Sequence, residues 1–103
     1  MIYRLRVTAR AVADADEAYA WIAKHISTAR AERWYEGLFK HMETLTRQPT
    51  RCPRAAESDR FSEELRELLY GSRKNKHRII FTIRGSDVVV LFVHNASRKE
   101  LEP

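Results

Sequence analysis

The side chains best suited to chemistry in this sequence stand at the ends of two apolar segments near the C-terminus. Arg78 lies at the start of HRIIFTIR (77–84), and Arg98 follows shortly after VVVLFVHN (88–95). Guanidinium groups stay charged and present several N–H donors, so they suit phosphate or carboxylate partners. His94 lies four residues before Arg98. Imidazole titrates near neutrality, so this side chain suits proton transfer. These three residues are candidates for binding a polyanion or for acid–base chemistry on it.

Each of these side chains also has a structural interpretation. His94, at the end of a strand, can hydrogen-bond the backbone and position the HNASR turn. Arg78, and likewise Arg66 on the preceding segment, can hold the sheet together by pairing with nearby carboxylates. The available carboxylates are those of Glu64, Glu67 and Asp87. The sequence leaves both interpretations open.

Further candidate contacts come from a basic loop and from aromatic residues. The loop SRKNK (72–76) carries Arg73, Lys74 and Lys76, which either stay solvated or contact phosphate or carboxylate groups. Trp34 and Tyr35 fall on an apolar helical stripe, as Trp21 does earlier in the chain. Packing in the core is the stronger expectation for these rings, although Trp and Tyr also anchor interfaces.

The N-terminal half predicts a strand followed by two helices. Residues 2–8 alternate apolar and polar side chains, which is typical of a strand with one buried face. From about Ala9 the period changes to that of an amphipathic helix. Ser27 or Thr28 can cap a second helix, which Pro49 ends. The apolar stripe of the first helix consists of Ala11, Ala15, Ala18, Ile22 and Ile26.

The C-terminal half predicts three strands in a meander, after a loop at 49–60 that begins no second domain. The strands are expected at about 64–70, 77–84 and 88–94, with the last one central because both of its faces are apolar. The helices should cover the face that carries Ile79 and Phe81. We therefore expect a single α+β domain over residues 1–103, in the order β-α-α-β-β-β, with an antiparallel helical hairpin on a small, mainly antiparallel sheet. The place of the first strand stays open.

Composition narrows the function classes. The chain has 103 residues, 44% hydrophobic and 32% charged, and a formal net charge of +5, which favours acidic partners such as nucleic acid or an acidic protein. A single cysteine, Cys52, allows neither an internal disulfide nor a metal knuckle, so no metal and no cofactor are expected. Arg4 and Arg6 interrupt any apolar leader, and no segment is long and apolar enough for a membrane, so we expect a cytoplasmic protein.

Several weak motifs in the right order resemble one family. The phrases LRELLYG, HRIIFTIRGSDVVVLFV and HNASR, with ERWYEGLFKHMETLTRQP as second helix, are similar to the RelE/ParE superfamily of toxins from bacterial type II toxin–antitoxin modules. The resemblance spans nearly the whole chain. It implies a growth-inhibiting toxin that a cognate antitoxin neutralises by wrapping its surface in a hetero-oligomer.

The resemblance implies two modes of action. RelE-like members are metal-independent endoribonucleases that cut messenger RNA on the ribosome, and ParE-like members inhibit DNA gyrase. Arg78 and Arg98 fall where such toxins carry arginines, and His94 would then transfer protons. The second-strand lysines of ribosome-dependent relatives align near 65–68, which leaves only Arg66 and Glu67, and the C-terminal tail lacks an aromatic residue. These differences favour the ParE-like mode, and a non-toxic, basic protein-binding module is a third alternative.

Overall fold

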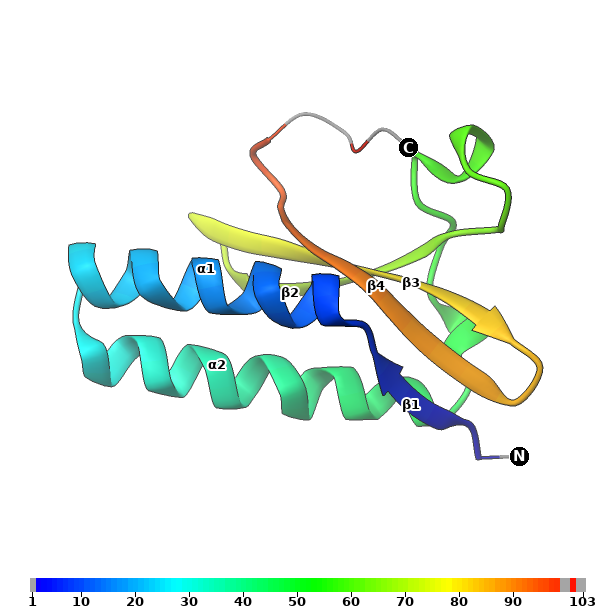
Figure 1. The fold of residues 1–103 in the computed structure, drawn as a ribbon, viewed down its shortest axis with the longest axis horizontal. Helices are drawn as coiled ribbons and strands as arrows, with labels where there is room; N and C mark the ends of the chain where they lie inside the picture. Colours follow the sequence, from blue (N-terminus) through cyan, green and yellow to red (C-terminus); the bar gives the residue numbers. More distant parts are fainter. Residues whose placement is uncertain (1, 99–100, 102–103) are drawn as a thin grey trace.

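Two helices lie side by side against one face of a mixed sheet in the computed structural model, which describes residues 2–98 and 101 (Figure 1). Within these residues the sheet has four strands in the spatial order β1-β4-β3-β2. The α+β fold class and the order of elements predicted from the sequence are confirmed. The elements are β1 (Arg4–Val7), α1 (Ala9–His25), α2 (Thr28–Glu43), β2 (Arg66–Ser72), β3 (Asn75–Arg84) and β4 (Asp87–Asn95).

The first strand lies at the edge of the sheet, next to the last one. β1 pairs in parallel with β4, with Arg4 opposite Asp87 and Val7 opposite Val90. Parallel neighbours need a crossover connection. Here the helical hairpin and the β2–β3 hairpin lie between the two strands in sequence. The three C-terminal strands form the predicted antiparallel meander, so β4 has a neighbour on each side over its first half.

β4 shows no apolar–polar alternation because both of its faces pack on apolar side chains, and a bulge also interrupts its pairing with β3. The pairing with β3 passes from Ile80 opposite Phe92 to Phe81 opposite Val90, so Leu91 is the extra residue. Leu91 and Phe92 both pack on the sheet face away from the helices, whereas Val90 and its counterpart beyond the bulge, Val93, belong to the core under the helices.

Side-chain caps begin both helices. The Thr8 hydroxyl accepts a hydrogen bond from the N–H of Ala11 at the start of α1, and Ser27 caps α2 in the same way. α2 ends at Glu43, earlier than predicted from Pro49, because a 3-10 turn (Thr44–Thr46) follows it directly. The prediction that Ile26 is part of the buried stripe is wrong. α1 ends at His25, and Ile26 is 48% exposed.

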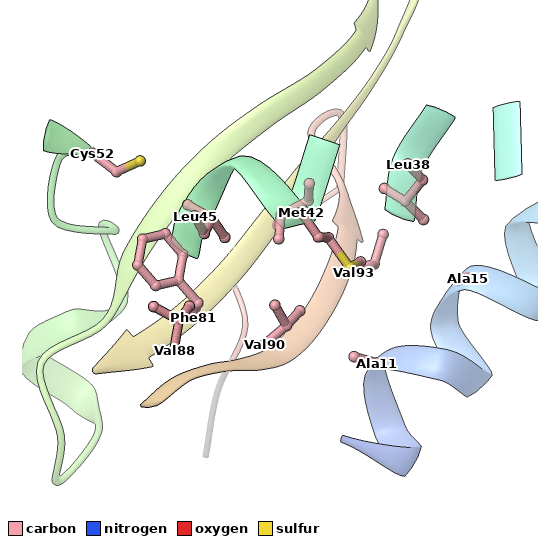
Figure 2. Close-up of a cluster of buried hydrophobic side chains, with 11 residues drawn as sticks. Ala11, Ala15, Leu38, Met42, Leu45, Cys52, Phe81, Val88, Val90 and Val93 are labelled. Carbon is pink, nitrogen blue, oxygen red and sulfur yellow. The ribbon is translucent and has the colours of Figure 1, made fainter. Parts of the chain in front are cut away.

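The main core lies between the helices and the sheet. Figure 2 shows Phe81 and Val88 of the sheet beside Leu45, with Met42 and Val90 nearby. Ile79 and Phe81 belong to this core, so the helices cover the predicted face. The opposite face of the sheet has a smaller core of its own, formed with the segment between α2 and β2 and with the C-terminal tail. Its members are Ala55, Phe61, Leu65, Ile80, Leu91, Phe92 and Leu101.

Candidate functional site

A groove of about 800 Å³ separates α1 from the end of β4 and the tail that follows. We call it the α1–β4 groove. On the helical wall, the side chains with polar or aromatic groups are Arg10, Asp14, Glu17, Trp21, Lys24 and His25. On the opposite wall, the charged, polar and tail residues include Lys74, Asn75, His77, His94, Asn95, Ser97, Arg98 and Leu101.

The groove exists because β1 is shorter than β4. The two strands pair only as far as Val90, and from there α1 runs along the edge of β4. Two side chains of the first turns hold the helix to this edge. The Thr8 hydroxyl donates to the carbonyl of Leu91 at 3.2 Å, and the Asp14 carboxylate accepts the N–H of Val93 at 3.1 Å. Beyond Val93 the lining side chains of α1 and β4 enclose the groove.

The described lining of the groove has an excess of positive charge. It contains four Arg or Lys side chains and two carboxylates. One carboxylate, Asp14, already pairs with Arg10, whose Nε lies 3.0 Å from Oδ1. Glu17 is the other carboxylate of the lining, which also contains the basic side chains of Lys24, Lys74 and Arg98. An anionic or acidic occupant suits this lining better than a basic one.

His77 is the buried polar residue of the groove wall, with 5% of its surface exposed. Its ring meets the indole of Trp34 edge-on, with centroids 5.0 Å apart. Its Nδ1 atom has no hydrogen-bond partner among the described residues. Burial lowers the pKa of His77 from its ordinary value of 6.5, and the positive charges of Arg98 and His94 lower it further, against the raising effect of a hydrogen bond to the Asn75 backbone.

Trp21 lies on the groove rather than in the core. It is 53% exposed and stacks on His25, with ring centroids 4.5 Å apart and planes inclined by 22°. The expectation of core packing is wrong for this residue because the buried side of α1 carries Ile22, about 100° around the helix. That offset, and the spacing of Trp21 and His25 by four residues, were signals in the sequence that pointed to this surface pair.

Arg78 points to the sheet face opposite the helices, where two carboxylates bind it. Its Nη1 donates to Oε2 of Glu57 at 2.8 Å, and its Nε donates to Oε1 of Glu67 at 3.1 Å. Glu57 is fully buried and also accepts the N–H of Leu101 at 2.9 Å. Hydrogen bonds from Arg78 lower the pKa of Glu57 from 4.5 to about 2, although burial acts in the opposite direction, and the Glu57 carboxylate raises the pKa of Arg78.

These contacts match the structural alternative for the two strand arginines. Arg78 pairs with Glu67, as that interpretation expects, although Glu57 was not anticipated. Arg66 pairs with Glu64, with Nη2 and Oε1 3.2 Å apart, and donates to the carbonyl of Thr50. Neither arginine is part of the groove lining.

His94 and Arg98 both line the groove, so the fold brings these two sequence-predicted residues to one hollow. His94 lies opposite Arg78 in the β3–β4 register. In the basic loop, Arg73, Lys74 and Lys76 are all exposed, and Lys74 is the one of them that lines the groove.

The other two aromatic candidates pack within the domain. Trp34 and Tyr35 are half-buried against the main core. The Tyr35 hydroxyl donates to the Asp16 carboxylate at 2.7 Å and thereby joins α2 to α1. Trp34 contacts the rings of Tyr70 and His77 on the sheet. Neither ring lines the groove.

Among residues 2–98 and 101, no three His, Cys, Asp or Glu side chains gather in a way that would hold a metal ion. Within the same residues, no helix combines the length and the apolar character needed to cross a membrane.

Comparison with known proteins agrees with the fold and the sequence motifs. The family model described as ParE toxin of type II toxin–antitoxin system, parDE, matches residues 5–100. Among solved structures, the chain resembles one described as the chromosomal ParDE TA system from P. aeruginosa, with a TM-score of 0.75 and 18% sequence identity over 91% of this chain and 96% of that chain. No curated protein sequence matches.

Proposed function

The chain belongs to the ParE toxin family of type II toxin–antitoxin systems, and we propose that it inhibits bacterial growth by binding DNA gyrase rather than by cutting RNA. As a toxin of such a module it has a cognate antitoxin as its partner. Inhibition of gyrase needs only a shaped surface, whereas RNA cleavage needs free cationic and acid–base groups around the scissile phosphate.

The main support for this proposal is that Arg78 is hydrogen-bonded to two carboxylates. A nuclease would use this guanidinium to stabilise charge on the phosphate, but its donors are held by Glu57 and Glu67. Releasing Arg78 would leave the fully buried Glu57 carboxylate without its cation, at a cost of roughly 3–5 kcal/mol. An arginine bound in this way favours a structural role.

One observation supports the alternative mode of action, RNA cleavage. His94 and Arg98 line the same groove, so a group suited to proton transfer and a cation suited to phosphate binding share one hollow. In that alternative, the chain is a metal-independent endoribonuclease whose substrate is ribosome-bound messenger RNA.

The exposed groove residues are the contacts we assign to partners. Lys74 and Arg98 lie on the groove with Trp21, and they suit an acidic antitoxin segment. Arg73 and Lys76, on the same basic loop, are further contacts for the antitoxin or for gyrase. We place the protein in the cytoplasm, where both partners would meet it, in a toxin–antitoxin hetero-oligomer.

Purified components separate the two modes of action. The protein is added to gyrase, relaxed plasmid and ATP, and in parallel to a reconstituted translation reaction with a labelled messenger RNA. We expect supercoiling to stop while the messenger RNA stays intact. Cleavage of the messenger RNA that disappears in His94→Ala and Arg98→Ala, but persists in Arg33→Ala on an exposed face of α2, would instead establish the nuclease.

A further inference from the structure

We infer that the tip of the hairpin between β2 and β3 binds the phosphate backbone of double-stranded DNA through Arg73, Lys74 and Lys76. That this DNA is the segment held by gyrase rests on the proposed function. The phosphate contact itself depends only on the turn, the charges and the neighbours of the hairpin tip.

The turn at the tip carries residues that its geometry does not require. Ser72 pairs with Asn75, so Arg73 and Lys74 alone form the loop. Two-residue hairpin loops favour Asn-Gly or another glycine pair, because the usual turns need positive φ. Neither loop residue has a positive φ here, and the left-handed position is instead Gly71, with φ 112°, where a Cβ would overlap the carbonyl oxygen of Asn75. Turn preference therefore does not explain the two cations, which indicates a functional reason for them.

The charges of the tip differ from those of the strands in having no acidic partner. Within the strands, the arginines that pair with carboxylates are Arg4, Arg6, Arg66, Arg78 and Arg84. Among residues 2–98 and 101, no carboxylate forms an ion pair with Arg73, Lys74 or Lys76, and all three side chains are exposed. Like charges on one short turn repel one another, and a row of phosphates relieves that repulsion.

The tip also projects beyond the neighbouring strands. The pairing of β4 with β3 ends at Asn95 opposite His77, and β1 pairs with β4 only as far as Val90. Residues 71–76 thus continue past the last paired residue of β4 as a two-stranded ribbon. The major groove of B-DNA, about 12 Å wide, admits such a ribbon, and basic side chains on it reach the phosphates at the rims.

A fourth cation lies beside the tip on the helical side. Along α2, the His41 ring nitrogen Nε2 lies 3.0 Å from the carbonyl oxygen of Leu69, and Trp34 contacts the ring of Tyr70. The N-terminal end of α2 therefore points towards the tip of the hairpin. Arg30 is exposed and lies one turn before Trp34 on the same side of the helix, so it flanks the tip.

Peptides and single strands suit the tip less well than a duplex. The tip, residues 72–76, contains no apolar or aromatic side chain. Peptide interfaces depend on buried apolar or aromatic anchors, and single-stranded nucleic acids on bases that stack on rings. The ring that precedes the tip, Tyr70, is directed to α2, where its hydroxyl donates to the carbonyl of Trp34. The backbone of a duplex needs only cations, because its bases already stack on one another.

A titration of labelled duplex DNA tests the contact. The purified protein is added to a duplex of about 20 base pairs at several salt concentrations, and fluorescence anisotropy gives the Kd at each. We expect Arg73→Gln, Lys74→Gln and Lys76→Gln each to lower the slope of log Kd against log salt by about 0.9, the value for one lost phosphate contact. The matched control Arg47→Gln removes one charge beyond the opposite end of α2 and should leave the slope unchanged.

Three results would overturn the inference. The first is a slope that none of the hairpin variants changes, and the second is an equal drop in slope for Arg47→Gln. The third is a single-stranded RNA of the same length that binds more tightly than the duplex and loses affinity in the same variants. Circular dichroism of each variant shows that the fold is retained, since the substituted side chains of the tip are exposed.

A gyrase assay tests separately whether the DNA is the segment held by gyrase. We expect the double variant Arg73→Gln/Lys74→Gln to need about tenfold more protein than the native chain to stop supercoiling, because two phosphate contacts are lost. Unchanged potency would overturn the assignment to DNA held by gyrase. Failure of the proposed function would look different, because the native protein would then leave gyrase active, while the DNA titration, which contains no gyrase, would be unaffected.

Discussion

At the scale of single residues, the buried cluster of Arg78, Glu57 and Glu67 is the most consequential feature. The cluster lies on the sheet face that the helices leave open, where Arg78 donates hydrogen bonds to both carboxylates. Glu57 also accepts a hydrogen bond from the backbone N–H of Leu101. Leu101 also lines the α1–β4 groove. One buried carboxylate therefore fixes part of the groove wall, although it lies outside the groove itself.

Substituting Glu57 by Gln tests how much this negative charge contributes to the stability of the fold. The pKa of Glu57 is about 2 in the folded protein against an ordinary 4.5, so folding favours the deprotonated form. The resulting stability, about 3 kcal/mol by linkage, is present above pH 4.5 and is lost as the pH falls toward 2. In urea unfolding, we expect Glu57→Gln to be less stable at pH 7 and the difference from the native chain to shrink on acidification.

Glu63→Gln is the matched control for that experiment. Glu63 forms a comparable pair with Arg84, with Oε1 and Nε 2.7 Å apart, but the side chains are 37% and 52% exposed. Loss of the Glu63 charge should cost clearly less stability than loss of the Glu57 charge, because solvent screens an exposed pair. Equal pH profiles for the two variants would mean that burial of Glu57 contributes nothing special.

At the scale of elements, the close approach of α2 to the sheet depends on a glycine. A Cβ at Gly37 would overlap the hydroxyl of Tyr70, which donates to the carbonyl of Trp34 at 2.9 Å. The ring of Tyr70 thus passes directly across the helix backbone. The glycine is needed here for space and not for its dihedral angles, since its φ is not positive.

A double-mutant cycle measures this contact. Gly37→Ala should destabilise the fold by about 2 kcal/mol through overpacking, despite the better helix propensity of alanine. In a Tyr70→Phe background, where the hydroxyl is absent, the same substitution should cost clearly less. Thermal unfolding of the four proteins gives the coupling, and additive effects would contradict the proposed clash.

The elements themselves were largely predictable, because periodicity, caps and turn residues are local signals. The position of β1 in the sheet was not predictable, because its pairing with β4 joins residues far apart in sequence, such as Leu5 and Val88. The β4 bulge gave no clear sign either, since an apolar run fits a straight central strand equally well. For the site, residue type identified His94, Arg98 and Lys74, but Glu57 comes from an aperiodic loop and its pairing with Arg78 required the tertiary fold.

At the scale of the whole molecule, β3 and β4 connect two cores. The helix-side core contains Leu38, and the smaller core on the other face contains Leu65, and both side chains are fully buried. Because the two cores share the central strands, we propose that they unfold together as one domain.

Core truncations on each face test this cooperativity. We expect Leu38→Ala and Leu65→Ala each to cost about 2–5 kcal/mol. In either variant, far-ultraviolet circular dichroism and tryptophan fluorescence should report the same unfolding midpoint. Different midpoints for the two probes in Leu65→Ala would indicate that the open-face core melts separately.

The parallel pairing of β1 with β4 also has a consequence for synthesis of the toxin. Residues 87–90, which pair with residues 4–7, are translated after both helices and after β2 and β3. The sheet edge, and the groove that begins where β1 ends, cannot form until β4 has been translated. A chain that stops before β4 would therefore lack this surface, so the toxin could become competent only after β4 has been made.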